Sequence, residues 1–335
     1  MAFEDRYLRL EAPLNQGVPT VFNLPFGLNV LSGRVILKAT VTITNAGAAG
    51  TPIGEGGPIR LIRRIQILAN KAAGSRYPNG YLVDCSPRSL LRYAMVERSG
   101  KFVGELSGNI LGGGVAGVYP IYLSIPIYFA SGILVNEMQT ALNLNQTDST
   151  GAPIYSSVQV KVDLAELLTE IFAGSGGTMV VNGLICWEDD RIALAKDSVP
   201  LRQEDHIALI QAAQETFVDP GMPNDGSFTS WLLLAEQGQP GEVLSDAILN
   251  RLEIQGGSLN FKEHWQEIRQ AMIDDGFYDP SSTMYGQFFL DWTKGLLVNS
   301  NPAAGLQARM SVNNPSGAGL DQLRVYTRRV YGLGS

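Results

Sequence analysis

The chain repeats one order of elements in its two halves. Residues 64–67 read Arg-Ile-Gln-Ile, and residues 251–254 read Arg-Leu-Glu-Ile. In each half an amphipathic helix ending in Ala-Met follows, at residues 94–95 and 271–272. An aromatic-rich strand, a polar loop and two closing strands come next in both halves. This order predicts one β domain present twice, although any two all-β domains share some of these patterns.

The spacing between the matched segments shrinks along the chain. Residues 64 and 251 are 187 positions apart, the helices at 94 and 271 are 177 apart, and Gln159 and Gln307 are 148 apart. The elements keep their order while the second copy loses loop length, which is the pattern expected of a duplicated domain.

Strands are predicted wherever β-branched and aromatic residues alternate with polar ones. Residues 59–68 place Ile65 and Ile67 on one face and Arg64 and Gln66 on the other. Residues 207–218 are ambiguous between helix and strand, and the analogy with residues 19–24 favours a strand for their C-terminal part. The other predicted strands are residues 35–44, 119–128, 158–162, 179–187, 231–234, 247–254, 285–292, 306–312 and 323–331.

Three helices are predicted. Ser86 is placed as the N-cap and Pro87 as the first residue of a helix with a stripe of apolar side chains. Residues 163–166 (Asp-Leu-Ala-Glu) have the spacing of a capping box and predict a short helix to Phe172. The third helix covers residues 262–272. The apolar positions are Leu90, Leu91, Ala94 and Met95 in the first helix, and Trp265, Ile268 and Met272 in the third.

Composition supports an assembled β protein. Charged residues are 17% of the 335 residues, and 37 Gly and 17 Pro suit strands joined by many turns. So few charges indicate a surface covered largely by neighbouring subunits. The net charge of −7 and the lack of a basic run argue against direct, sequence-specific nucleic-acid binding. The pairs Arg63-Arg64 and Arg328-Arg329 are interpreted as solvated or interfacial.

No segment has the apolar core of a signal peptide or the roughly 18 to 20 apolar residues of a membrane span. We therefore expect a soluble chain made in a cytosol. The two cysteines, Cys85 and Cys186, stand far apart and are expected to be buried free thiols.

The expected fold is all-β, with two tandem eight-stranded jelly-roll β-barrels and short helices in the loops. The predicted divisions are an N-terminal arm (residues 1–16), a first jelly roll (17–193), a linker (194–204) and a second jelly roll (205–335). The acidic stretch from residue 188 onward and Pro200 locate the linker.

The sequences of two predicted strands, and the helices that follow them, resemble those of a known family. Residues 61–70 (Leu-Ile-Arg-Arg-Ile-Gln-Ile-Leu-Ala-Asn), followed by the helix with Leu-Leu-Arg-Tyr at 90–93, are similar to the first barrel of double-jelly-roll major capsid proteins. Residues 248–256, followed by the helix at 265–272, are similar in the same way to the second barrel. This is the lineage of adenovirus hexon and of tailless, membrane-containing icosahedral bacteriophages. The resemblance covers residues 33–331 and concerns layout, because no invariant motif defines the family.

The resemblance implies a structural protein of the virion, synthesised in the host cytoplasm, without enzymatic activity or cofactor. It implies pseudo-hexameric homotrimers that tile an icosahedral shell, over an internal membrane. Implied partners are copies of the chain itself and minor capsid, penton or spike proteins. Residues 3–14 would lie near the inner face, where Arg6 and Arg9 would meet anionic lipid; the alternative is an ordinary arm that leads into a strand.

The alternative function is a two-jelly-roll carbohydrate-active enzyme (an amidase or glycosidase) or a glycan-binding module. Its candidate groups are weak. The two histidines, His206 and His264, are in no metal-binding motif, and the glycines at 112–114 precede no phosphate-loop lysine. The paired acids at 188–190 resemble a linker start more than catalytic carboxylates. The remaining candidates are calcium ligands at Asp274, Asp275 and Asp279, and a sugar platform of Trp231, Trp265 and Trp292, for which core packing is the better explanation.

Overall fold

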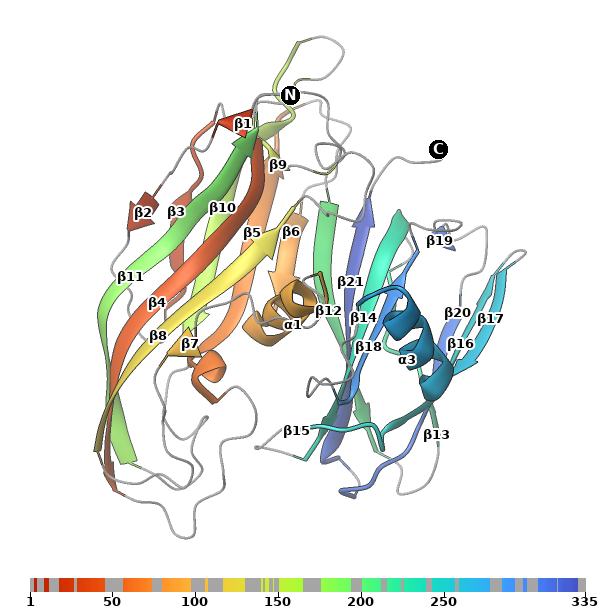
Figure 1. Ribbon diagram of the computed structural model, residues 1–335. Helices are drawn as coiled ribbons and strands as arrows, with labels where there is room; N and C mark the ends of the chain where they lie inside the picture. The colour runs from red at the N-terminus through yellow and green to blue at the C-terminus, as the bar shows by residue number, and fades with distance from the viewer. Residues whose placement is uncertain are drawn as a thin grey trace. The chain divides into compact units, whose positions relative to one another are not determined.

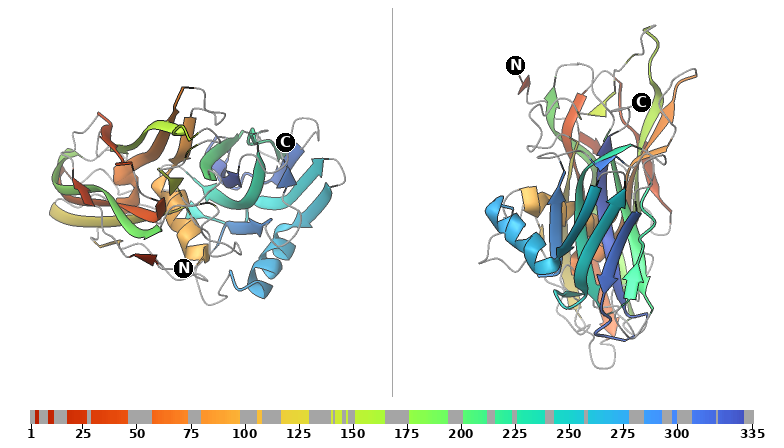
Figure 2. Two further views of the ribbon diagram at one scale, coloured as in Figure 1. Left: turned by 90° about the horizontal axis from the view of Figure 1, so that it is seen from above. Right: turned by 90° about the vertical axis from the view of Figure 1, so that its right-hand side faces the viewer.

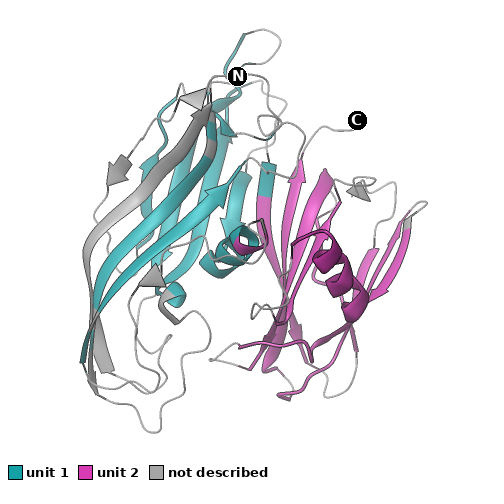
Figure 3. Cartoon of the chain, viewed as in Figure 1, with its two compact units in different colours: residues 1–94, 102–202 teal, residues 95–101, 203–335 magenta. Residues whose placement is uncertain are grey.

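A computed structural model describes most of the chain (Figure 1). The described residues are 3–4, 9–11, 18–26, 29–45, 57–73, 80–97, 106–107, 117–129, 140, 142–144, 147, 151–164, 176–193, 201–211, 216–223, 226–238, 243–256, 259–277, 285–292, 298–299, 307–317 and 319–330. The chain divides into two compact units, coloured separately in Figure 3. Unit 1 comprises residues 1–94 and 102–202, and unit 2 comprises residues 95–101 and 203–335.

Unit 1 contains two antiparallel sheets. One has the order β1-β11-β4-β8-β7, with β2 added to β11 and β9 to β4. The other contains β6, β5, β10 and β3 in that order. In Figure 1 the long strands β11, β4 and β8 run side by side. The bounds in this unit are β1 (Phe3–Glu4), β2 (Arg9–Glu11), β3 (Thr20–Asn23), β4 (Asn29–Asn45), η1 (Gly57–Leu61), β5 (Ile62–Lys71), β6 (Gly80–Cys85), β7 (Leu106–Ser107), β8 (Gly117–Tyr128), β9 (Leu142–Asn143), β10 (Tyr155–Leu164) and β11 (Gly176–Ala193). Helix α1 (Pro87–Glu97) follows β6, and its residues 95–97 are grouped with unit 2.

Unit 2 repeats this plan. One sheet contains β15, β14, β21 and β12 in that order, with β18 and β19 paired to β14. The other has the order β13-β20-β16-β17. The bounds are β12 (Leu201–Ile210), β13 (Thr216–Val218), β14 (Ser227–Gln237), β15 (Val243–Leu244), β16 (Leu249–Gly256), β17 (Leu259–His264), α3 (Trp265–Asp274), β18 (Gln287–Asp291), β19 (Val298–Asn299), β20 (Gln307–Val312) and β21 (Asp321–Val330).

The two units have equivalent strand orders. The order β3-β10-β5-β6 of unit 1 matches β13-β20-β16-β17 of unit 2, and β8-β4-β11 matches β18-β14-β21. In both, the helix follows the strand β6 or β17 directly. The prediction of an all-β chain built as two jelly rolls is confirmed.

Strand register gives a stricter test of the repeat. Ile65 on β5 lies opposite Val162 on β10, and Leu252 on β16 lies opposite Met310 on β20. Residues 65 and 252 are 187 positions apart, and residues 162 and 310 are 148 apart. These are the two spacings found independently from the sequence. The segments at 64–67 and 251–254 therefore occupy equivalent strands in the same register.

Alternation explains why these segments are strands. Ile65, Ile67, Leu252 and Ile254 are fully buried, whereas the residues between them are partly or well exposed. Burying each such side chain stabilises the fold by about 1.5–3 kcal/mol. A shift by one residue would turn this set to solvent, so the pattern fixes the register.

The core of unit 2 joins its two sheets. Trp231 on β14 is fully buried, and its ring meets those of Phe228 and Trp292 edge-on at centroid distances of 5.2 and 5.5 Å. Trp265 and Trp292 are partly buried and pack against the same cluster. The prediction that these tryptophans serve core packing is confirmed.

The predicted start of the first helix is confirmed. The Ser89 backbone N–H donates to the Ser86 hydroxyl at 3.3 Å, as expected of an N-cap. Leu90, Leu91 and Ala94 are buried as predicted, while Met95 is half-buried.

The third predicted helix began too early. Residues 262–264 belong to β17, and α3 begins at Trp265. Glu267 accepts the His264 backbone N–H at 2.7 Å, which marks His264 as the N-cap. The strands β6 and β17, which lead into the two helices, were not predicted.

Four further predictions need correction. Asp163 and Leu164 end strand β10, so no helix begins there; residues 165–172 lie outside the described part of the chain. Residues 59–61 form part of η1, because β5 starts at Ile62, and residues 247–248 form a turn before β16. Residues 188–193 continue β11 instead of opening a linker.

Two of the predicted divisions of the chain, the arm and the linker, contain strands in the structure. β1 and β2 of the predicted arm (residues 1–16) pair with β11, and β12 begins at Leu201, inside the predicted linker (194–204). Residues 194–200 lie outside the described part.

Candidate assembly surface and the pocket beneath helix α3

Equivalent edge strands of the two units carry exposed apolar side chains. Among the described residues, β3 pairs only with β10 and β13 pairs only with β20. Val21 on β3 is 44% exposed, and Phe217 on β13 is 51% exposed. Val18 and Phe26, which flank β3, are also exposed. Edge strands with apolar side chains are surfaces that proteins otherwise cover or charge, so they mark sites for contact with another chain.

Phe217 lies beside a charged cluster. The Arg251 guanidinium lies 5.8 Å from the centre of the Phe217 ring. Arg251 also pairs with Glu253 at 2.6 Å, and Lys262 pairs with Glu253 at 3.3 Å. This mixture of one exposed ring and paired charges is typical of the rim of a protein–protein interface.

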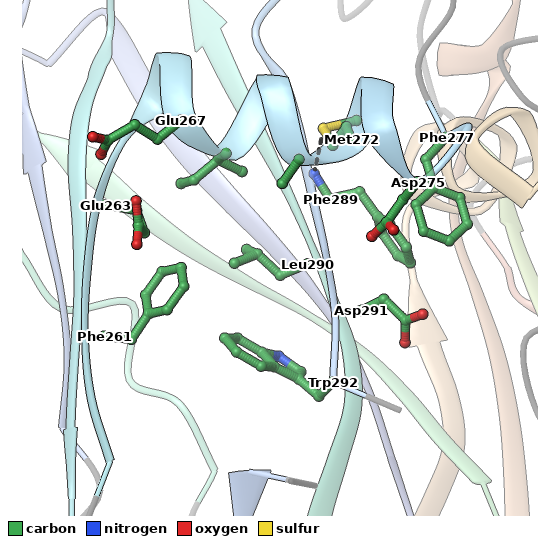
Figure 4. A pocket seen from close by; sticks show the side chains of 12 residues that line it. Phe261, Glu263, Glu267, Met272, Asp275, Phe277, Phe289, Leu290, Asp291 and Trp292 are labelled. Carbon is green, nitrogen blue, oxygen red and sulfur yellow. Dashed lines mark hydrogen bonds between the residues drawn. The ribbon is translucent and has the colours of Figure 1, made fainter. Parts of the chain in front are cut away.

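A pocket of about 280 Å³ lies beneath α3 (Figure 4). Its side chains come from the three elements β17, α3 and β18 and from the residues that follow α3 and β18. The right-hand view of Figure 2 shows α3 beside the strands of its own unit. Apolar side chains form the interior, and four carboxyl groups complete the lining. The lining residues are Phe261, Glu263, Glu267, Ile268, Ala271, Met272, Asp275, Phe277, Phe289, Leu290, Asp291 and Trp292.

Two of these carboxyl groups interact directly. Burial raises the pKa of Glu263, and hydrogen bonding and repulsion from Glu267 raise it further. The pKa of Glu267 is lowered, chiefly because the His264 backbone N–H donates to its carboxylate. Between the two pKa values the pair holds one proton and one negative charge.

The enzyme alternative gains no support from this pocket. Glu263 and Glu267 are close enough to shift each other's pKa, whereas the two carboxyl groups of glycosidases stand about 5 to 9.5 Å apart to accommodate the sugar. Trp292 contributes to the lining, but its ring also packs on Trp231 in the core.

The two histidines lie on strands β12 and β17. His264 is exposed and ends β17. His206 lies on β12, with its Nε2 atom 3.4 Å from the Thr327 hydroxyl. Within the described residues, no group of three or more His, Cys, Asp or Glu side chains is arranged to hold a metal ion.

The acidic clusters fall into two different settings. Residues 188–190 lie within β11. Asp274 is the last residue of α3, and Asp275 is its C-cap and lines the pocket. Asp279 lies outside the described residues, as do the glycines at 112–114.

The second arginine pair was wrongly interpreted. Arg328 and Arg329 are 1% and 2% exposed, and Arg329 pairs with Glu204 at 2.5 Å. A buried guanidinium is tolerated where it has an ionised partner, as Arg329 has in Glu204. Arg63 and Arg64 are exposed as predicted, and Arg64 binds Asp84 through two nitrogens.

Cys85 is a buried free thiol, as predicted, whereas the side chain of Cys186 is outside the described set. Of the helices that the structure describes, none has the length and apolar character to cross a membrane.

Sequence reasoning favoured a strand for the C-terminal part of residues 207–218, where β13 lies, but missed the pocket. Phe261, Phe277 and Phe289 come from separate elements, and no spacing links them. The only available signal was the alternation of Leu259, Phe261 and Glu263, which the apolar stripe of the following helix concealed.

Comparison with known proteins identifies the architecture. No protein-family model matches this sequence, and no curated protein matches it. Solved structures do match. The STIV MCP, from Sulfolobus Turreted Icosahedral Virus, aligns with a TM-score of 0.64 at 9% identity, over 99% of this chain and 97% of that one. The major capsid protein of Bacteriophage PM2 aligns with a TM-score of 0.56 at 10% identity, over 98% and 99%.

The Faustovirus major capsid protein aligns with a TM-score of 0.56 at 8% identity, over 98% of this chain and 90% of that one. All three matches span both units, and the identities are low enough that the likeness concerns the backbone. The chain has the double-jelly-roll fold of viral major capsid proteins.

Proposed function

We propose that this chain is a major capsid protein, the structural subunit of an icosahedral virus shell. The observation that carries the proposal is the match to the STIV MCP, which covers nearly the whole of both chains. The proposed location is the capsid shell of the virion, after synthesis in the host cytoplasm, and the proposed role is not enzymatic.

The proposed assembly is a homotrimer. Two jelly rolls per subunit give six similar units per trimer, so a threefold oligomer approximates the sixfold symmetry of a tile. The exposed apolar residues on β3 and β13 support contacts with neighbouring chains, and the small share of charged residues favours burial of the surface. We further propose residues 17–193 and 205–335 as the two jelly rolls, joined by residues 194–204, of which the last four already belong to β12.

Further partners belong to the same proposal. Minor capsid, penton or spike proteins would contact the tile, and residues 3–14, through Arg6 and Arg9, would face an internal membrane. With a net charge of −7, the chain is not proposed to bind nucleic acid in a sequence-specific way.

Native mass and electron microscopy test the assembly. Light scattering should give a particle of three times the 36.2 kDa subunit mass, or larger arrays. Micrographs should show hexagonal tiles or closed shells. A stable monomer at high protein concentration would refute the proposal. A negative charge introduced at the edge by Phe217→Glu should lower the mass, whereas a negative charge introduced by Gln266→Glu at an exposed position of α3 should leave it unaltered.

A further inference from the structure

The strand register matches the two helices residue by residue. Ile65 of β5 lies opposite Cys85 of β6, and Leu252 of β16 lies opposite Glu263 of β17. Because Ile65 and Leu252 are equivalent, Cys85 and Glu263 are equivalent too, and they are 178 positions apart. The helices begin two residues later in both units, so the same offset applies to α1 and α3. It exceeds by one residue the spacing of 177 between the two Ala-Met pairs.

This offset reveals an aromatic side chain that unit 2 lacks. It places Tyr93 of α1 at the position of Ala271 of α3, and it matches Leu90 with Ile268, which are both buried. Tyr93 is 2% exposed, whereas Ala271 is exposed and lines the pocket beneath α3. An alanine beside a pocket of about 280 Å³ thus takes the place of a buried tyrosine.

The register also matches the segments that follow β3 and β13. Thr20 lies opposite Val162 in unit 1, and Val218 lies opposite Met310 in unit 2. Because Val162 and Met310 are equivalent, Thr20 and Val218 are equivalent and are 198 positions apart. The same offset matches Leu-Pro at residues 24–25 with Met-Pro at residues 222–223.

Here unit 1 has the additional aromatic side chain. Phe26 follows Pro25 directly, and Asn224 stands at the matching position in the sequence of unit 2. Phe26 is 51% exposed, which is more than any other aromatic side chain that the structure describes in unit 1. Unit 1 therefore carries an unburied ring, and unit 2 carries a pocket of the size of one bulky side chain.

The ring and the pocket lie at opposite ends of equivalent sheets. In unit 1, β3 ends the order β3-β10-β5-β6, and in unit 2, β17 ends the order β13-β20-β16-β17 on the other side. Identical subunits that form a closed ring meet head to tail, so each contact joins two different surfaces. In a ring of three such chains, a β3 end in one copy can meet a β17 end in the next.

We propose that the Phe26 ring of one copy enters the pocket beneath α3 of the next copy. This inference rests on the proposed homotrimer, in which three such contacts join unit 1 of each chain to unit 2 of its neighbour. The volume is just below the range of about 300–1,000 Å³ for small-ligand sites, which suits one bulky side chain. The side chains that would surround the ring are at most 7% exposed: Ile268, Met272, Phe289 and Leu290.

Cross-linking tests the contact in the full chain. Phe26→Cys and Ala271→Cys are combined in one chain, and the assembled protein is treated with a short bismaleimide that joins two thiols. Denaturing gels should show covalent dimers and trimers. Each single variant, and the unaltered chain with Cys85 and Cys186, should remain at the mass of one subunit. A mixture of the two single variants should give dimers without trimers, because each chain then supplies one end of the contact.

A double-mutant cycle measures whether the two sites act together. Phe26→Ala removes the ring and Ala271→Phe fills the pocket, and each should raise the dissociation concentration of the trimer by roughly tenfold or more. The two changes together should raise it no further than either one, because the side chain introduced at position 271 replaces the missing ring. Gln266→Phe, at an exposed position of α3 outside the lining, should leave dissociation unchanged. Circular dichroism checks that each variant is folded.

The outcomes separate this contact from the proposed function. If the unaltered chain forms trimers or tiles but the double-cysteine variant is not cross-linked, the contact is refuted and the proposed shell stands. Additive effects in the cycle would refute the contact as well. Cross-links in Ala271→Cys alone would mean that two pockets face each other, which also contradicts it. An unaltered chain that stays monomeric would refute the proposed function together with this contact.

Discussion

Helices α1 and α3 have the same place in their two jelly rolls but differ in burial. α1 buries Leu90, Leu91, Tyr93, Ala94 and Val96, together with the polar side chains of Arg88 and Ser89. α3 buries only Ile268 and Met272 and has a pocket with an acidic rim beside it. The duplicated strands keep their order and register, whereas the helices have diverged. Strand pairing tolerates few changes, while a helix packed on the surface can change its outer face freely.

The largest effect should come from the matched core positions. Ile65→Ala and Leu252→Ala each remove a fully buried side chain from equivalent strands. Each should lower the free energy of unfolding by about 2–5 kcal/mol, measured by urea denaturation. If only one of the two changes destabilises the chain, the two strands are not energetically equivalent despite their common register.

The stability cost of removing an ion pair should differ between the two units. Asp246 binds Arg269 and also accepts the Gly286 backbone N–H at 2.6 Å, with both side chains largely buried. Asp246→Ala should cost about 1.5–3 kcal/mol, because the charged Arg269 guanidinium and the Gly286 backbone N–H lose their acceptor. In unit 1, Asp84→Ala breaks a pair with Arg64, which is 48% exposed, and should cost about 0–1 kcal/mol. Equal costs in thermal unfolding would contradict this contrast.

Removing the N-cap side chain should cost more stability at the start of α1 than at the start of α3. Ser86→Ala removes the hydroxyl that caps α1 and should cost about 1 kcal/mol in urea denaturation. His264→Ala at the start of α3 should cost less, since the bond at that N-cap runs from the backbone of residue 264 to Glu267. A larger loss from His264→Ala would mean that the imidazole itself caps α3.

The smallest effect is a pH dependence at the rim of the pocket. The pKa of Glu263 is raised, so the folded chain binds its proton more tightly than the unfolded chain. Stability should therefore fall as pH rises from the ordinary value near 4.5 through the raised pKa. Glu263→Gln should remove this fall. Unfolding measured from pH 4 to 7 checks the difference; Glu267, whose pKa is lowered, acts in the opposite direction.

Sequence-based prediction succeeded where a residue pattern is compatible with only one kind of secondary structure. The period-two segments at 64–67 and 251–254 define β5 and β16, and Ser86 with Pro87 marks the start of α1. It failed at β17, where Lys262, Glu263 and His264 are half-buried or exposed and the apolar stripe of α3 extends the helical pattern backward. It also failed at Arg328 and Arg329, because burial of a charge depends on a distant partner.

The sequence by itself determined the duplication, the all-β class and the register of the matched strands, because alternation along a strand and order along the chain are local properties. Only the tertiary structure decided which edges stay open, which arginines are buried and how β17, α3 and β18 enclose a pocket. These features depend on side chains that are remote in sequence, and their contacts exist only after the sheets have paired.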